Sequence, residues 1–496
     1  MLFNSYLFLF LFLPVVWVGF FALARKSRVA SATWMAVASV LFYASWDSTY
    51  LFLLLASIVV NHGFGLWMLR LRGRGDEGSV KQVLRLAVIT NLAALGYFKY
   101  ANFFVDTLNA ASGVSWSIGE VVLPMGISFF TFTQIAFLVD TAQGKVKEQN
   151  FVHYVLFVTF FPHLIAGPVL HHKDMMPQFA KSDSYRVNWE NMATGLMLLA
   201  VGLCKKVLLA DSLAPYATGI FDAVAPAVGA TTSTPTIYEA WAGALAYTLQ
   251  IYFDFSGYTD MALGIALMFN IRLPINFDSP YQATSIIEFW RRWHITLSTF
   301  LRDYLYIPLG GNRLGSTRRH VNLMTTMLLG GLWHGAGWTF VIWGGLHGLF
   351  LVVNHLWRGW VARGWVFWPA GWAGRLLGGL LTFVVVVTAW VFFRADSVEQ
   401  AWVLVKAMYG FDARATTFDA VIHGRFIELV PMSSKDLARL LTLGLLWVWL
   451  LPNSGRVAFA PRGRLVTCGL AVIVLGTFGV VIDRFGAYSP FLYFQF

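Results

Sequence analysis

The amino-acid sequence predicts an all-α polytopic membrane protein. The chain is 57% hydrophobic and only 12% charged, whereas soluble domains carry about 25% charged residues. Apolar stretches long enough to cross a bilayer, which takes about 20 residues, recur along almost the whole chain. We therefore expect one integral membrane domain over residues 1–496, with a core at about 120–360 and peripheral helices at 1–110 and 375–484.

The apolar stretches predict on the order of eleven to thirteen membrane-embedded segments. The candidates lie at 6–24, 31–46, 48–69, 83–105, 121–140, 151–170, 192–214, 238–271, 321–356, 376–393, 437–452 and 464–484. The stretch at 321–356 is long enough for two passes or for a broken helix. Broken or re-entrant segments are tolerated at membrane depth only where protein shields them or where they line a cavity.

Basic residues at the ends of the first apolar stretches predict the orientation of the chain. The clusters RKSR at 25–28 and RLRGR at 70–74 bracket the charge-poor turn WDST at 46–49, and Lys145 and Lys147 fall on the same side as the clusters. Lysine and arginine are enriched in cytoplasmic loops. We therefore expect an uncleaved first span whose N-terminus lies on the side of the membrane away from the cytoplasm.

Composition and missing motifs argue against several other classes of protein. The net charge of +11 sits at the ends of apolar stretches rather than in a soluble basic domain, so we expect no nucleic-acid partner. The two cysteines, Cys204 and Cys468, form neither a disulfide framework nor a zinc-ligand pattern. The chain has no phosphate-binding Walker loop, dinucleotide fingerprint, serine-hydrolase elbow or HExxH zinc motif. We expect no metal and no permanently bound cofactor.

The run from Glu288 to Tyr306 has the spacing of an amphipathic helix. Its polar stripe consists of Arg291, His294 and Ser298, and its apolar stripe of Trp290, Trp293 and Leu297. Such a helix can lie in the membrane interface, with snorkelling arginines and a tryptophan belt. It can equally line the mouth of a polar funnel, with its arginines facing an anionic ligand, and the spacing leaves both interpretations open.

A second histidine, His334, lies in the apolar stretch 321–356, within the motif WHG. His347 follows thirteen residues later. On one unbroken helix these two side chains would point about 220° apart. Glycines at 330, 331, 335, 337, 344 and 345 allow close helix packing or a break. An imidazole at membrane depth suits general-base catalysis, although a buried histidine can also be purely structural.

The stretch 250–260 places Asp254, Ser256, Tyr258 and Asp260 within another apolar segment. Paired acids in a helical bundle can form a proton path or can hydrogen-bond neighbouring helices, and the structural role is the one we favour. In a transporter, these acids and the histidines would form a proton relay.

Four ordered segments of the sequence resemble the membrane-bound O-acyltransferases, and the bacterial alginate O-acetyltransferase branch in particular. They are FFPHLIAGPV at 160–169, QIYFDFSGYTDMALGIA at 250–266, NFDSPYQATSIIEFWRRWHITLSTFLRDYLYIPLGGNR at 276–313 and GLWHGAGWTFVIWGGLHG at 331–348. The resemblance implies a helical bundle around a central funnel, with re-entrant or tilted helices. It also implies a location in the bacterial inner membrane, with the N-terminus in the periplasm. The implied donor is acetyl-CoA on the cytoplasmic side, and the implied partners are periplasmic acetyltransferase or acceptor proteins.

The same resemblance implies roles for individual residues. The family's characteristic histidine falls on His334 and its second polar residue on His294, which makes both of them candidate catalytic residues. The candidate substrate-binding residues are Trp333, Arg291, Arg292, Arg302 and Ser298. The implied activity is O-acetylation of an exported polysaccharide, alginate in the first place. Cellulose, peptidoglycan or another cell-wall polymer is the alternative acceptor.

Overall fold

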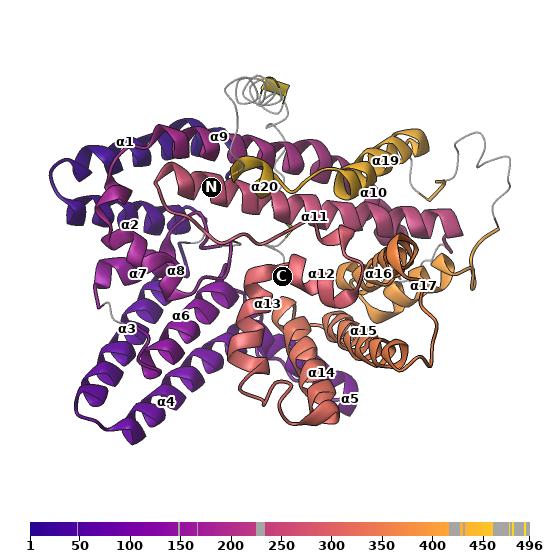
Figure 1. The fold of residues 1–496 in the computed structure, drawn as a ribbon, viewed down its shortest axis with the longest axis horizontal. Coiled ribbons are helices and arrows are strands. Elements are labelled where there is room, and N and C mark those ends of the chain that lie inside the picture. Colours follow the sequence, from indigo (N-terminus) through magenta and orange to yellow (C-terminus); the bar gives the residue numbers. More distant parts are fainter. Residues whose placement is uncertain are drawn as a thin grey trace. The chain divides into compact units, whose positions relative to one another are not determined.

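The computed structural model describes residues 1–46, 48–146, 149–165, 167–224, 234–415, 427–429, 432–459, 476, 479–480 and 491–492. Regular structure in these ranges is helical, and an isolated β-bridge joins Thr236 to Arg414. The predicted all-α class is therefore confirmed (Figure 1).

The chain divides into two compact units, which are described separately. The first comprises Met1–Leu203, Tyr258–Ile275 and Ala458–Gln495. The second comprises Cys204–Gly257, Asn276–Val457 and Phe496. The long helix α11, Ile237–Met268, contributes to both units.

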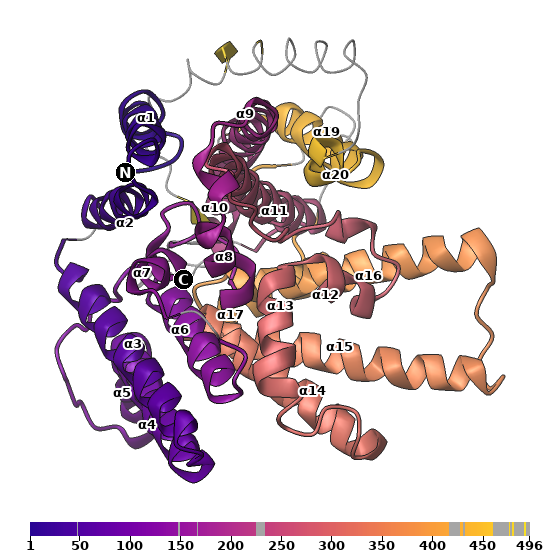
Figure 2. The same cartoon turned by 60° about the vertical axis from the view of Figure 1, so that its left-hand side comes forward.

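The first unit begins with hairpins of neighbouring helices (Figure 2). Its helices are α1 (Leu13–Ala24), α2 (Arg28–Ala44), α3 (Leu51–Gly73), α4 (Glu77–Leu95), α5 (Ala101–Ser112), α6 (Ile127–Ala142), α7 (Phe151–Thr159), α8 (His172–Ala180) and α9 (Trp189–Cys204). Ser27 caps α2 by accepting from the Ala30 N–H, and Asp76 caps α4 by accepting from the Ser79 N–H. The basic cluster at 25–28 lies at the connection between α1 and α2, and the cluster at 70–74 lies in the last turn of α3, just before the connection to α4.

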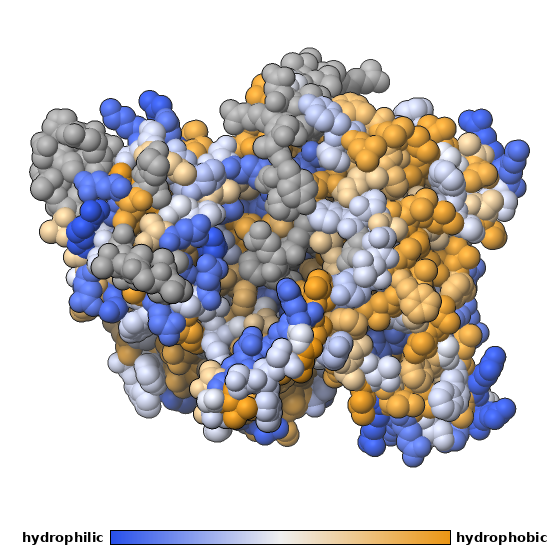
Figure 3. Space-filling model, turned by 180° about the vertical axis from the view of Figure 1, so that it is seen from behind, coloured by the Kyte–Doolittle hydropathy of each residue, from blue (hydrophilic) through white to orange (hydrophobic). Residues whose placement is uncertain are grey.

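The first unit exposes large apolar side chains on its outer helices. Figure 3 shows an apolar face on the side where α1 to α4 lie, and Val37, Leu41, Phe52, Val59 and Ile89 are among the exposed residues. Apolar patches of this kind are rare on soluble monomers and mark contact with membrane or protein. This surface fits a multi-pass membrane protein.

Helices of the second unit, with the turns between them, carry the candidate catalytic and substrate-binding residues. They are α10 (Asp211–Val224), α12 (Ile286–Arg292), α13 (Ile295–Leu301), α14 (Gly315–His334), α15 (Trp338–Ala362), α16 (Gly371–Arg394), α17 (Val398–Met408), α19 (Ser434–Leu450) and α20 (Ser454–Phe459), together with the first part of α11. The stretch 321–356 is therefore a broken helix, and the break between α14 and α15 falls at Gly335–Gly337.

Glycines bring α14 and α15 into close contact beside this break. A Cβ on Gly331 would lie 2.3 Å from the Phe340 carbonyl oxygen, and a Cβ on Gly344 would lie 2.4 Å from the Met327 carbonyl oxygen. Backbones can approach this closely only where no side chain intervenes. The glycine-rich sequence thus fixes the hairpin that ends one helix at His334.

A buried lysine of the second unit, Lys206, is paired with two carboxylates. Lys206, in a π-helical turn at Lys205–Ala210, contacts Asp211 at 2.8 Å and Asp254 at 2.5 Å. A buried ion pair of this kind avoids the large cost of an isolated charge. The structure therefore agrees with a structural role for Asp254, which we favoured from the sequence.

Glu239, near the start of α11, is fully buried and ties the C-terminal part of the unit to that helix. Its Oε1 accepts from the N–H groups of Glu428 and Leu429, at 2.7 and 2.9 Å. Its Oε2 accepts from the Thr236 N–H at 2.9 Å and lies 3.4 Å from the Arg414 guanidinium. A carboxylate with this set of donors tolerates burial.

Four helices in the described residues are long and apolar enough to cross a membrane: Leu51–Gly73, Trp189–Val224, Trp338–Ala362 and Gly371–Arg394. Each overlaps a predicted segment. The prediction of a helical span at 151–170 is wrong, because α7 ends at Thr159 and the chain continues through turns. The predicted span at 464–484 lies outside the described residues, apart from 476 and 479–480.

Candidate active site

The run predicted as one amphipathic helix from Glu288 to Tyr306 is in fact broken at His294. Helix α12 ends at Arg292 and α13 begins at Ile295, and His294 between them has φ 43° and ψ 53°. This left-handed conformation is uncommon for residues other than glycine. Arg291, His294 and Ser298 therefore do not share one helical face, and the single-helix prediction is wrong.

Asn276 holds the break in place through contacts that are distant in sequence. Its backbone carbonyl accepts from the Ile295 N–H at 2.9 Å. Its side-chain Oδ1 accepts from the N–H and hydroxyl of Thr296, at 3.3 and 3.0 Å, and lies 3.1 Å from His294 Nδ1. These bonds stabilise the backbone of His294, and they offset the cost of its strained dihedral angles.

The same contacts define the tautomer of His294. The backbone N–H of Thr296 can only donate, so the Asn276 atom that it meets is the amide oxygen. That oxygen can only accept, so His294 Nδ1 carries the proton and donates it. Burial lowers the pKa of His294 to about 3. The imidazole is therefore neutral at physiological pH, and its acceptor lone pair is on Nε2.

His334 is the last residue of α14, and its side chain is buried among aromatic rings. Its ring centroid lies 5.0 Å from that of Trp333, 5.1 Å from that of Trp343 and 5.2 Å from that of Phe393. The His294 and His334 rings are neighbours, with centroids 6.2 Å apart. The fold thus brings together two imidazoles that are 40 residues apart in the sequence.

His347 has a different environment on α15. Its Nδ1 accepts from the Trp290 indole N–H at 3.3 Å, and its ring stacks on Phe289 at 6.1 Å. It contacts Trp343, as His334 does, but its other aromatic neighbours come from α12, from α15 itself (Phe350) and from α16 (Trp390). The break at Gly335–Gly337 therefore separates the two histidines, and His347 has the contacts of a packing residue.

The remaining candidate residues lie in varied surroundings. Arg292 pairs with Glu288 at 2.6 Å, and Arg302 pairs with Asp303 at 2.7 Å. Arg291 is exposed and has no ion pair among the described residues. The Ser298 hydroxyl donates to the Trp293 carbonyl at 3.3 Å. Trp333 lies beside both histidines, whereas two of the three arginines already have acidic partners.

Sequence reasoning missed Asn276 and the aromatic walls of the site. Asn276 opens the longest segment of the resemblance, but no spacing rule connects it to a histidine 18 residues away. Phe255 contacts His294 edge-on at 4.8 Å, and Phe393 contacts His334 from α16. In the part of the chain that the structure describes, no group of three His, Cys, Asp or Glu side chains is placed to hold a metal ion.

Comparison with known proteins gives a consistent picture. The family model of the membrane-bound O-acyltransferase family (MBOAT) matches residues 141–392, a range that contains both His294 and His334. The peptidoglycan O-acetyltransferase of Helicobacter pylori is 38% identical, over 100% of this chain and 98% of its own. The probable alginate O-acetylase AlgI of Azotobacter vinelandii is 40% identical over the full length of both chains. The probable alginate O-acetylase AlgI of Pseudomonas aeruginosa is 43% identical, over 83% of this chain and 75% of its own.

Proposed function

Because the chain belongs to the membrane-bound O-acyltransferase family and is a multi-pass membrane acyltransferase, we propose that it O-acetylates an exported polysaccharide. The acyl donor is acetyl-CoA on the cytoplasmic side of the bacterial inner membrane. The acetyl group crosses the membrane through the protein and reaches the polymer with the help of periplasmic partner proteins. The N-terminus is periplasmic.

The pair of buried imidazoles is the observation that supports this chemistry most directly. His334 takes the proton from an acceptor hydroxyl while the hydroxyl oxygen attacks the thioester carbonyl. The tetrahedral intermediate collapses with loss of the thiolate, which receives the proton back from the imidazolium, and an ester has then replaced the thioester. General-base assistance of this kind contributes about 10²–10⁴-fold to the rate.

His294 has a positioning role in this proposal. Its neutral ring is held as the Nδ1–H tautomer by Asn276, so its Nε2 accepts a hydrogen bond from another donor group of the bound substrate, because the single hydrogen of the attacking hydroxyl goes to His334. Stabilisation of a developing oxyanion, the other role open to a histidine beside a general base, needs a hydrogen-bond donor. Because Nε2 is an acceptor in this tautomer, His294 is better suited to orienting the substrate than to stabilising the oxyanion.

The arginines contribute to donor binding to different degrees. Arg291 is exposed and has no ion pair among the described residues, so it is the arginine best suited to the donor phosphates. Arg292 and Arg302 would have to leave Glu288 and Asp303 before binding phosphate. Their contribution is therefore smaller.

Alginate is the acceptor that we propose first, and peptidoglycan is the second candidate. Two AlgI proteins are 40% and 43% identical to this chain. The peptidoglycan enzyme is 38% identical over the full length, which is a comparable match. Acetyl transfer to alginate oligosaccharides and to peptidoglycan fragments, measured side by side with the partner proteins present, distinguishes the two acceptors.

Thioester turnover by the purified protein tests the enzymatic proposal. We expect His334→Ala to lower the rate of acetyl-CoA consumption by about 10²–10⁴-fold, the contribution of a general base. The matched control is His347→Gln, which changes a second buried histidine of the same hairpin and keeps most of its volume. It should retain turnover once corrected for the amount of folded protein.

Two results would contradict the proposal. A His334→Ala protein that elutes and melts like the wild type and still consumes acetyl-CoA at the wild-type rate excludes His334 as the base. A wild-type protein that carries protons but never turns over a thioester points instead to the relay of a transporter. Asp254 would be part of such a relay, although Lys206 already neutralises it.

A further inference from the structure

A cavity of about 690 Å³ lies in the second unit, between α15, α16 and the start of α12. Its walls are mostly apolar and include Phe350, Val353, Leu381 and Val385. The cavity has the size of a small-molecule site. Because α15 and α16 are two of the helices long enough to span a membrane, we expect the apolar part of the cavity to lie at the depth of the acyl chains of the bilayer.

Two arginines lie at one end of this cavity. Arg358 is in the last turns of α15 and Arg375 is near the start of α16, so both are close to the loop that joins these helices. Both side chains are exposed, and neither has an ion pair among the described residues. Asn354, one turn before Arg358, also lines the cavity, and its Oδ1 is buried without a hydrogen-bond partner in the described part of the chain.

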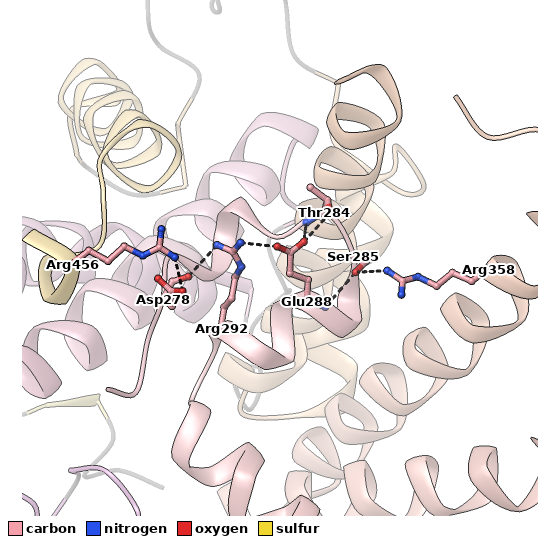
Figure 4. A network of polar contacts seen from close by, with 7 residues as sticks. All are labelled: Asp278, Thr284, Ser285, Glu288, Arg292, Arg358 and Arg456. Carbon is pink, nitrogen blue, oxygen red and sulfur yellow. Dashed lines mark hydrogen bonds and ion pairs between the residues drawn. The ribbon is translucent and has the colours of Figure 1, made fainter. Parts of the chain in front are cut away.

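The acidic side chains of the polar network that includes Arg358 are engaged with other partners (Figure 4). Glu288 accepts from the N–H and hydroxyl of Thr284 and pairs with Arg292, and Asp278 pairs with Arg456 at 2.8 Å. Arg358 has a single long contact, at 3.4 Å, to the hydroxyl of Ser285. Its charge is therefore not neutralised by these carboxylates.

Desolvation raises the pKa of Glu288, but the hydrogen bonds from Thr284 and the ion pair with Arg292 outweigh it and leave the pKa below its ordinary value. Glu288 therefore stays ionised and bound to Arg292. It is not available to Arg358 at neutral pH.

An apolar slot with two unneutralised guanidinium groups at its mouth matches one class of ligand. Guanidinium binds phosphate through paired charge-assisted hydrogen bonds, and the slot offers an acyl chain an apolar surface. We propose that this cavity binds an anionic phospholipid, with its phosphodiester on Arg358 and Arg375 and one acyl chain between α15 and α16. A headgroup hydroxyl, as in phosphatidylglycerol, would donate to Asn354 Oδ1.

The bound lipid also has a structural consequence. The cavity reaches Ser285, which caps α12 by accepting from the Glu288 N–H at 3.3 Å. Helix α12 leads into His294 at its other end. An occupied cavity therefore supports the element that positions this histidine. The lipid site does not depend on which acyl donor or polymer the enzyme uses.

Native mass spectrometry of the full-length protein with defined lipids tests the site. The protein is released from nanodiscs that contain phosphatidylglycerol or phosphatidylcholine, and the retained lipid is counted. We expect Arg358→Gln/Arg375→Gln to retain about tenfold less phosphatidylglycerol than the wild type, because the phosphate contacts are lost. The double lysine variant should retain an intermediate amount.

A second variant tests the slot independently of charge. Leu381→Trp fills the apolar part of the cavity from a side chain that is already 58% exposed, so folding should be little affected. It should also lose the bound lipid. The matched control is Arg363→Gln, at the same end of α15, whose guanidinium lies over the Trp365 ring and outside the cavity lining. This control should bind phosphatidylglycerol like the wild type, and all variants are first compared by melting and elution.

Four outcomes would overturn the proposal. The first is undiminished phosphatidylglycerol binding by both cavity variants. The second is equal retention of phosphatidylcholine, and the third is an equal loss in Arg363→Gln, which would indicate general surface charge. The fourth is displacement of the lipid by acetyl-CoA or by soluble glycerol 3-phosphate, which would indicate a site for a soluble phosphate compound.

Discussion

A single residue, His294, shows how the site depends on contacts that are remote in the sequence. Its backbone adopts a left-handed conformation, and Asn276 both holds that conformation and favours the Nδ1–H tautomer by accepting a hydrogen bond from Nδ1. Asparagine here acts on the histidine much as a carboxylate acts in other sites, but it adds no charge. The ring is oriented while remaining neutral.

Replacing Asn276 should lower the turnover rate of the protein that remains folded. In Asn276→Ala, His294 loses the acceptor that fixes its tautomer, so we expect a fall in kcat of about tenfold, which corresponds to one hydrogen bond of about 1.4 kcal/mol. The measurement is acetyl-CoA turnover normalised to folded protein.

The matched control for this variant is Asn322→Ala. Asn322 is also buried and donates to the carbonyls of Leu309 and Gly311, at 3.2 and 3.0 Å. Its loss should reduce stability but leave kcat unchanged. Equal falls in kcat for the two variants would show that Asn276 has no specific effect on the histidine.

The burial of His294 also predicts how stability depends on pH. The pKa of His294 in the folded protein, about 3, is below its ordinary value of 6.5, so below pH 6.5 the unfolded chain binds a proton that the folded chain does not bind. The stability that this residue contributes is fully present above pH 6.5 and is lost as the pH falls towards 3. The slope reaches about 1.4 kcal/mol per pH unit for one such group.

His294→Gln should remove this part of the pH dependence. The free energy of unfolding is measured by denaturation in detergent at pH 7, 6 and 5. Between pH 7 and pH 5 it should fall further for the wild type than for the variant. Parallel curves for the two proteins would mean that His294 binds a proton as readily in the folded state as in the unfolded state.

Among the elements, the hairpin of α14 and α15 sets the position of His334 through close backbone contact. Gly344 and Gly345 are adjacent on α15 and offer a direct comparison. A Cβ on Gly344 would lie 2.4 Å from the Met327 carbonyl oxygen, whereas a Cβ on Gly345 would meet only Leu328 Cδ2 at 3.5 Å. The first contact requires the helices to separate, and the second is ordinary van der Waals contact.

We therefore expect opposite effects from two similar substitutions. Gly344→Ala should destabilise the protein by about 1–3 kcal/mol, the cost of overpacking. Gly345→Ala should leave stability unchanged or raise it by about 0.5–1 kcal/mol, because alanine is the better helix former. Thermal unfolding in detergent compares them, and equal melting temperatures would show that α14 and α15 are not packed through Gly344.

The elements also show how far the sequence could predict this site. Hydrophobicity predicted the class of fold, and the glycines around His334 predicted that its helix could break. The break at His294 could not be predicted, because the flanking residues keep helical spacing and the strain is offset by Asn276, from another segment. The aromatic walls from Phe255 and Phe393 likewise come from separate helices.

At the scale of the whole molecule, the basic turns predict the orientation in the membrane. Positions 26 and 74 lie at exposed turns of the first unit, and position 49 lies at the turn between them. In a chain whose native cysteines are replaced, we expect Thr49→Cys to react with an impermeant maleimide added from the periplasmic side. Lys26→Cys and Arg74→Cys should react only after the membrane is opened. The reverse pattern would invert the predicted topology.

The hydrogen bonds to Glu239 limit how the C-terminal part of the chain can be lost. Two of the donors to this buried carboxylate, the N–H groups of Glu428 and Leu429, belong to the segment just before α19. A chain ending before that segment would keep the acid in the interior with half of its contacts, which costs several kcal/mol. A related chain that ends before α19 should therefore have a residue other than glutamate at the position of Glu239. The C-terminal helices and this glutamate would be gained or lost together in evolution.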